Sequence, residues 1–160
     1  PAKGGEVMVT NFLTKALREL CAQAVAEFRL HTKDGKTLRA PRIVNGFLPP
    51  KRSGNGELDD FPFVLVRPEA GTGDRESEEV RVNIIVGCYS EEYDGFEYGV
   101  NVIERIKEKI CTLPAETLEQ RYQMRYPIKW NMVPEQPWPQ WQIDMETIWI
   151  FNSPRNTDDF

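Results

Sequence analysis

The last third of the chain contains two segments in which apolar and polar residues alternate strictly. The first is YQMRYPIKWNM (122–132) and the second is WQIDMETIWIF (141–151). Because successive side chains of a β-strand point to opposite faces, each segment gathers its large apolar residues on one side. The intervening VPEQPWPQ is rich in proline and polar residues, as turns are. The pattern predicts a terminal β-hairpin with an aromatic inner face, which restricts the fold to one with a half-buried antiparallel sheet.

Three of the four tryptophans lie within residues 134–151, and two interpretations compete for them. A ligand platform would place aromatic rings on an exposed surface, whereas the core face of a hairpin would turn them inward. Trp141 and Trp149 are in register with the apolar residues of the second segment, which favours the core. Trp138 lies between two prolines, outside the alternation, so it is the tryptophan that we expect to face a partner.

The rest of the chain contains two helical patterns and two strand patterns. Apolar residues at a spacing of three and four predict helices over about 11–28 and 96–113. Apolar runs predict strands over 61–68 and over VRVNIIVGCYS, residues 80–90. Between the first helix and the first strand, the Asp-Gly dipeptide at 34–35 predicts a hairpin turn with short extended segments on either side.

The order helix, extended arm, strand, strand, helix, strand, strand predicts an α+β fold. We expect a two-layer sandwich with a mainly antiparallel four-stranded sheet, helices packed on one face, and an extended hairpin arm. The 160 residues fit a single domain, with residues 1–9 and 152–160 as flexible termini. No stretch approaches the ~18 apolar residues of a membrane span, and no secretory leader opens the chain, so no membrane partner is expected.

Charge is distributed unevenly along the chain. Residues 1–52 contain ten Lys/Arg and four Asp/Glu, a net charge of +6; residues 53–160 contain ten and twenty-one, a net charge of −11, and the two sum to −5. Nucleic-acid binding would favour a basic domain, so sequence recognition of nucleic acid is not expected. Two regions of opposite sign suit identical subunits that meet head to tail, although ordinary solvated side chains explain the same numbers.

Few residues offer catalytic chemistry. The sequence has no P-loop, dinucleotide-binding, HExxH or paired Cys/His motif. The only histidine, His31, is a conceivable base for Cys88, because a nucleophilic thiol needs a neighbouring base. However, Cys88 occupies the apolar register of a strand, where cysteine behaves as a small hydrophobic residue. Three cysteines without CxxC spacing indicate free thiols in a reducing cytoplasm, and we expect no enzyme.

A cluster of carboxylates follows the predicted strand at 80–90. Such a cluster could hold a hard divalent cation, which prefers oxygen ligands, but it lacks the spacing of a calcium-binding loop. A solvated turn that leads into the next helix is the preferred interpretation, so no resident metal or other cofactor is expected. The weak candidates for metal binding are Glu91, Glu92, Asp94 and Glu97.

Several sequence patterns occur in an order that resembles a known protein family. They are LPP, then DDFPFVLVRP, an acidic loop, VRVNIIVGCYS, the helix GVNVIERIKEKI, and PWPQWQIDMETIWI. The chain resembles the tail terminator (tail completion) proteins of long-tailed bacteriophages and prophages over roughly residues 10–152. The resemblance lies in the order of the elements and in short patterns such as DFPFxxVRP and PWPQW, which are no catalytic signature.

The resemblance implies a structural virion protein without catalytic residues. Its subunits would form a six-membered ring that caps the tail tube, ends tail polymerisation and provides the docking face for the head. The implied partners are other copies of the chain, the tail tube protein and a head-completion or connector protein. The implied locations are the host bacterial cytoplasm during assembly and then the head–tail junction of the virion. Some relatives assemble with magnesium, so a divalent cation in assembly is an open alternative.

The resemblance also suggests which residues make contacts. Loops that touch the tube or head would correspond by position to residues 51–60 and 69–79, and the ring would close through strands and extended segments of adjacent subunits. The tube- or head-contact candidates are Arg52, Asn55, Glu57, Asp59, Asp74, Glu76, Glu78 and Glu79. The subunit-interface candidates are Arg39, Arg42, Phe47 and Trp138.

Three other functions stay open at this point. The first is a head-closure or neck protein of the same virion. The second is a small-ligand-binding regulatory module that uses the corner formed by Trp138 and Trp141. The third is an enzyme that uses Cys88 or the carboxylate cluster at 91–97.

Overall fold

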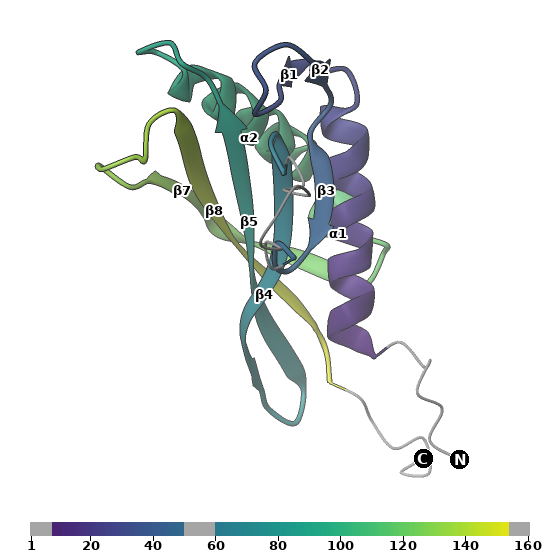
Figure 1. Cartoon of the computed structure of the whole chain (residues 1–160). Helices are drawn as coiled ribbons and strands as arrows, with labels where there is room; N and C mark the ends of the chain where they lie inside the picture. The colour runs from purple at the N-terminus through teal and green to yellow at the C-terminus, as the bar shows by residue number, and fades with distance from the viewer. Residues whose placement is uncertain (1–7, 50–59, 154–160) are drawn as a thin grey trace.

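The computed structural model of the protein describes residues 8–49 and 60–153, and Figure 1 shows how their elements are arranged. In chain order the elements are α1 (Val9–Val25), β1 (Leu30–His31), β2 (Leu38–Arg39), β3 (Arg42–Asn45), β4 (Phe63–Gly73), β5 (Ser77–Tyr89), α2 (Phe96–Cys111), the short 3-10 helix η1 (Pro114–Glu116), β6 (Thr117–Leu118), β7 (Tyr122–Met132) and β8 (Gln140–Asn152).

Both predicted helices are confirmed, with shifted ends. Each buries one apolar stripe, which includes Leu13 and Leu17 in α1 and Ile103 and Ile106 in α2. The first helix stops at Val25, before the predicted end at residue 28. There the Arg29 guanidinium donates hydrogen bonds to the carbonyl oxygens of Ala26 and Phe28, at 2.8 and 2.7 Å, which satisfies groups left unpaired at a helix end.

The predicted four-stranded antiparallel sandwich is wrong. The main sheet has six strands in the order β3-β4-β5-β8-β7-β6, and it curls into a half-barrel. The pair β3–β4 is parallel and the other pairs are antiparallel, so the sheet is mixed. A separate two-stranded sheet joins β1 to β2 (Figure 1).

Two short strands account for the larger sheet. Part of the predicted arm forms β3, which pairs with the start of β4. Two backbone hydrogen bonds of 2.9 Å join these segments: the Arg42 N–H donates to the Pro62 oxygen, and the Gly46 N–H donates to the Val66 oxygen. At the opposite edge of the sheet, Leu118 of β6 pairs with Tyr122 of β7. Segments of four and two residues show too little alternation to be recognised from periodicity.

The predicted loop at 69–79 is the end of a long β-hairpin. Residues of β4 pair with β5 out to Gly73 and Glu78, with an irregularity between Pro68 and Ala70. At the turn, the Asp74 carboxylate accepts hydrogen bonds from the N–H groups of Glu76 and Ser77, both at 2.8 Å. These bonds lower the pKa of Asp74. The acidic, glycine-containing composition of residues 69–79 is typical of a loop, but pairing between β4 and β5 orders this segment.

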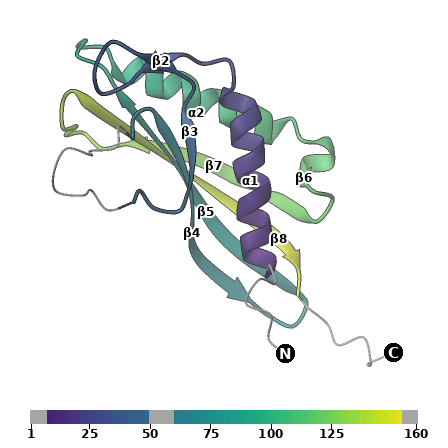
Figure 2. The ribbon, with the colours of Figure 1, turned by 45° about the vertical axis from the view of Figure 1, so that its right-hand side comes forward.

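The core lies between the helices and one face of the sheet. Trp149, Tyr122, Ile143 and Met145 are fully buried there, which confirms the predicted inner face of the terminal hairpin at these positions. Tyr126 and Trp130, which were expected on the same buried face, are 52% and 39% exposed. Figure 2 shows α1 running across the strands. The Tyr122 hydroxyl donates a 2.9 Å hydrogen bond to the Val9 carbonyl oxygen, which ties β7 to the start of this helix.

A smaller apolar cluster lies apart from this core. It consists of Phe63, Leu65 and Ile85, and Val44, Leu48 and Phe61 pack against it.

In the small sheet, the predicted Asp-Gly turn is confirmed. The Asp34 carboxylate accepts hydrogen bonds from the Thr32 hydroxyl at 2.6 Å and from two backbone N–H groups, and these bonds lower its pKa.

Candidate functional site

The structure brings the one conceivable catalytic pair, Cys88 and His31, to the same pocket. This pocket has a volume of about 140 Å³, and Tyr89 and Tyr98 also line it. The Cys88 thiol is buried and lies 3.9 Å from the Gly95 carbonyl oxygen. Burial raises the pKa of Cys88 to about 12. Because the thiolate is the nucleophilic form, this environment is the opposite of the one that activates a catalytic cysteine.

We expect alkylation of the native protein to avoid Cys88. Iodoacetamide at pH 8 should modify the half-buried Cys111 well before the buried Cys21 and Cys88, because burial also raises the pKa of Cys21 to about 12. Peptide mass spectrometry after short labelling times measures the order, and labelling in denaturant, where all three should react, is the control. If Cys88 reacts first in the native protein, it is a reactive thiol and the enzyme hypothesis returns.

The carboxylate cluster lies in the exposed turn before α2. The Tyr98 hydroxyl donates a 3.1 Å hydrogen bond to Glu92, and this bond, together with the negative charge of Glu92, raises the pKa of Tyr98. The Tyr89 hydroxyl lies 3.4 Å from Glu91. The Asp94 carbonyl oxygen accepts the Glu97 N–H at 3.0 Å, in the first turn of the helix. Within residues 8–49 and 60–153, no group of three or more His, Cys, Asp or Glu residues is arranged to hold a metal ion.

The two tryptophans of the β7–β8 corner have different roles. The Trp141 indole N–H donates a 3.0 Å hydrogen bond to the Ser90 carbonyl oxygen, and its ring packs 6.1 Å from that of Phe96, centroid to centroid. Trp141 therefore anchors the start of α2. Trp138 is 56% exposed, as expected for a residue that faces outward.

The predicted interface residues of the arm make contacts within the chain. Arg39 donates a 2.8 Å hydrogen bond to the Phe61 carbonyl oxygen. Arg42 forms a 3.1 Å ion pair with Asp60, which is buried. Phe47 is largely exposed on one side, while the Arg67 guanidinium lies 4.1 Å from its ring centroid on the other. The two arginines therefore hold the arm against the segment that leads into β4.

The predicted contact loops are only partly described. Arg52, Asn55, Glu57 and Asp59 lie outside the described residues. Asp74, Glu76, Glu78 and Glu79 lie together at the end of the β4–β5 hairpin, which extends past the lower end of α1 in Figure 1. Every residue from Pro68 to Glu76 is exposed.

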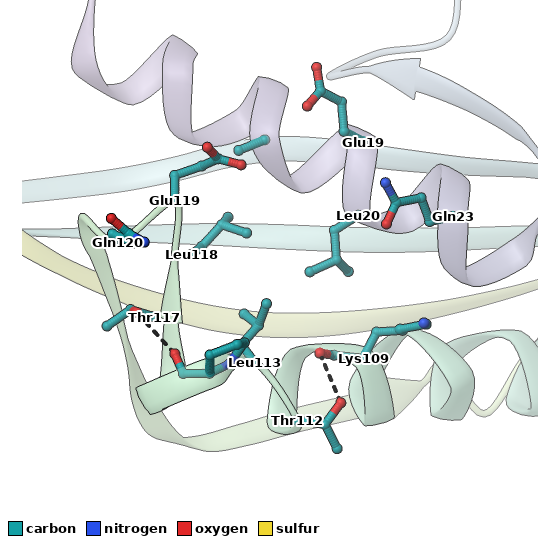
Figure 3. A pocket seen from close by; sticks show the side chains of 12 residues that line it. Glu19, Leu20, Gln23, Lys109, Thr112, Leu113, Thr117, Leu118, Glu119 and Gln120 are labelled. Atoms are coloured by element: carbon teal, nitrogen blue, oxygen red, sulfur yellow. Dashed lines mark hydrogen bonds between the residues drawn. The ribbon is translucent and has the colours of Figure 1, made fainter.

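The sequence did not indicate a cleft of about 600 Å³ at the end of the helices (Figure 3). Leu20, Leu113 and Leu118 line it, and its charged lining residues include Glu19 and Lys109. The cleft is built by α1 and by the continuous segment from the end of α2 through the β6–β7 turn, and these two parts lie about ninety residues apart in the chain. No local motif could therefore have revealed it.

The main sheet also has two strand edges that no described strand covers. On β7, pairing with β6 reaches only Gln123, so the outer edge from Met124 to Met132 has no strand partner among the described residues. On β4, pairing with β3 ends at Val66, so the outer edge from Arg67 to Gly73 is likewise unpaired in the described part of the chain. Unpaired edges present N–H and C=O groups that can bind another strand.

No protein-family model and no curated protein sequence matches the chain. The resemblance to tail terminator proteins therefore depends on the sequence patterns alone. Neither helix of the described residues has the length and apolar character needed to cross a membrane. The fold and surfaces define a small mixed α+β protein with an open sheet and a projecting hairpin.

Proposed function

We propose that the protein is a structural subunit of a phage or prophage tail. Copies of it would assemble into a six-membered ring that caps the tail tube, stops further polymerisation and provides the docking face for the head. The observation that best supports this function is the projecting end of the β4–β5 hairpin, which is ordered by its own hydrogen bonds and exposed from Pro68 to Glu76. Ordered protrusions of this kind contribute little to a core and suit contact with a partner.

The hairpin is held at a defined position against the body. The Ser153 hydroxyl donates a 2.6 Å hydrogen bond to the Asp74 carbonyl oxygen, and the Ser153 N–H donates one of 3.1 Å to the Glu76 oxygen. Arg125 of β7 forms a 3.0 Å ion pair with Glu79. A preorganised surface loses less conformational entropy when it binds, so this geometry supports a contact role for the hairpin.

The hairpin end carries carboxylates that would meet the tube or the head, of which Glu76 is exposed and Glu78 is half-buried. We expect the double substitution Glu76→Gln and Glu78→Gln to weaken tube capping about tenfold, because charges at an interface accelerate encounter and align partners. Glu79 is kept, since it pairs with Arg125. Electron microscopy of tubes grown from the tube protein of the same phage, with increasing amounts of this chain, measures the capping concentration.

The matched control is Glu104→Gln with Glu135→Gln, which removes the same charge from exposed positions outside the hairpin. This control should cap tubes as the wild type does, and all three proteins should unfold at similar urea concentrations. Equal capping by the hairpin variant and the wild type would exclude a contact role for these carboxylates. A wild-type protein that never limits tube length would contradict the proposed function itself.

A head-closure protein of the same virion would use the hairpin in the same way. The tube-capping experiment distinguishes the two functions, because only a tail terminator should limit tube length.

A small-ligand-binding module is the second candidate, and the cleft in Figure 3 is the observation that favours it. Its lining comes mostly from the helices and the β6–β7 turn, away from the Trp138–Trp141 corner that the sequence had suggested.

A further inference from the structure

We propose that the cleft at the end of the helices is a docking site for an arginine-bearing segment of a partner protein. The cleft has a volume of about 600 Å³, which is within the range of sites that bind a ligand. Its lining residues come from α1 and from the segment between the end of α2 and the β6–β7 turn (residues 119–121), and none belongs to β4 or β5. The inference therefore goes beyond the proposed function and does not depend on the β4–β5 hairpin.

The β6–β7 turn carries side chains on a backbone that favours glycine. Glu119 and Gln120 both have a φ angle of 54°. The Arg121 N–H donates a 3.1 Å hydrogen bond to the Leu118 carbonyl oxygen, which closes the turn around them. Two successive positive φ angles are typical of a type I′ turn, which prefers Asn and Gly at these positions. Other residues are unfavourable there, because their Cβ atom lies too close to the following carbonyl oxygen.

The two strained residues direct their side chains to the cleft. Glu119 and Gln120 line it, and both are exposed. Figure 3 shows Glu119 pointing from the turn towards α1. Within residues 8–49 and 60–153, neither side chain has a hydrogen bond or ion pair that would account for its presence. Residues held in sparsely populated conformations cluster at ligand-binding sites, so these side chains serve an occupant of the cleft rather than the fold.

The preceding segment contains two residues of the same conformation that the fold itself explains. Ala115 and Glu116 have φ angles of 54° and 55°, but neither lines the cleft. The Glu116 N–H donates a 2.9 Å hydrogen bond to the Leu113 carbonyl oxygen, and the Glu116 oxygen accepts one of 3.3 Å from the Gln123 side chain. These bonds attach η1 to the start of β7. The pair at 115–116 therefore provides a comparison for the pair at 119–120.

The floor of the cleft is apolar. Leu20 and Leu118 are buried, and Leu113 is half-buried. Figure 3 shows these side chains in the middle of the cleft, between α1 and the end of α2. Such a floor accepts the aliphatic stem of a long side chain, whose charged end stays at the rim in contact with water.

The polar groups around this floor determine which occupant fits. The charged lining residues are Glu19, Glu119 and Lys109, so carboxylates outnumber cations. An arginine matches both features, because its stem packs on the leucines and its guanidinium pairs with carboxylates through two parallel hydrogen bonds. Lys109 and the amides of Gln23 and Gln120 supply donors, and the amides also acceptors, for the backbone of the same segment.

Neighbouring cations do not cancel the two carboxylates. The Arg121 guanidinium lies 5.5 Å from the Tyr122 ring centroid. Arg105 of α2 forms a 3.1 Å ion pair with Glu108. Arg18 lies on the other side of α1, because the lining positions 16, 19, 20 and 23 share one helix face. Among the described residues, Lys109 is the only lysine or arginine that lines the cleft.

The test titrates the full chain with the synthetic peptide acetyl-Gly-Leu-Arg-Leu-Gly-amide. Methyl NMR spectra follow Leu20, Leu113 and Leu118, and we expect saturable shifts with a Kd below about 1 mM. The same peptide with citrulline in place of arginine keeps the shape and removes the charge. It should bind about tenfold more weakly, because hydrogen bonds to a charged group are stronger than those between neutral groups.

A double variant removes the side chains that the turn presents. Glu119→Gly with Gln120→Gly should unfold at a higher urea concentration than the wild type, because glycine adopts positive φ angles without strain. It should bind the arginine peptide at least about tenfold more weakly. Ala115→Gly is the matched control: it relieves the same backbone conformation outside the cleft, so it should gain stability and bind as the wild type does.

A gain in stability combined with a loss of binding is specific to side chains that are retained for an occupant. A double variant that binds the peptide as tightly as the wild type, or that unfolds at a lower urea concentration, would overturn the inference. Equal affinities for the arginine and citrulline peptides would exclude recognition of the guanidinium. Free arginine amide that binds as tightly as the peptide would indicate a small-molecule site, and leucine shifts that do not saturate would exclude docking of such a segment.

Discussion

Replacement of Trp149 by alanine should lower the free energy of unfolding by about 3–5 kcal/mol, the range for deleting a large buried aromatic side chain. Trp149 is fully buried between the sheet and the helices. Its indole N–H donates a 2.9 Å hydrogen bond to the Thr147 hydroxyl, which in turn donates a 2.7 Å bond to the Val82 carbonyl oxygen. The substitution therefore leaves a cavity and disrupts a buried hydrogen-bonded chain that joins β8 to β5.

Urea unfolding followed by circular dichroism measures this loss. Trp138→Ala is the control, because Trp138 is 56% exposed and should contribute less than about 0.5 kcal/mol. Trp149→Phe keeps most of the ring and should cost less than the alanine substitution. Similar unfolding midpoints for the Trp149 and Trp138 alanine variants would mean that Trp149 does not lie at the centre of the core.

Replacement of Gly87 by alanine should destabilise the protein by about 1–3 kcal/mol through overpacking. A Cβ atom at Gly87 would lie 2.2 Å from two carbon atoms of the Phe63 ring. Phe63 is buried and packs against Phe61, with ring centroids 5.2 Å apart, so it has little room to move. The strain would fall on the smaller apolar cluster, which the arm helps to cover.

Gly71→Ala is the matched control, since it makes the same change at a strand glycine where only ordinary contacts result. It should leave the stability of the monomer unchanged or raise it by up to about 1 kcal/mol. Combining Gly87→Ala with Phe63→Leu should recover part of the loss, because the two residues touch. A stable Gly87→Ala variant would show that Phe63 does not cover this position.

Local periodicity was sufficient to predict both helices and the longer strands, although not the mixed sheet that the strands form. The alternation in 141–151 identified the buried side of β8, where Ile143, Met145 and Trp149 are fully buried. The helical spacing and the Asp-Gly turn were also interpreted correctly, because each is determined by residues close together in the chain. The environment of Cys88 followed from its position in an apolar strand.

The incorrect predictions concern contacts between distant segments. The parallel pairing of β3 with β4 joins residues about twenty positions apart, and no local pattern encodes it. The end of the β4–β5 hairpin has the composition of a loop, yet the Asp74 turn and pairing with β8 order it. The candidate surfaces could not be predicted for the same reason. The cleft and the two free edges can be identified only once the strand order and the packing of the helices are known.

The proposed function depends above all on whether the chain closes a ring with copies of itself. Sedimentation velocity of the full chain over increasing concentration, with negative-stain electron microscopy of the same samples, measures this directly. We expect a discrete species near six times 18.5 kDa that images as a closed ring. A chain that remains at 18.5 kDa throughout, both alone and with tail tubes present, would contradict the proposal.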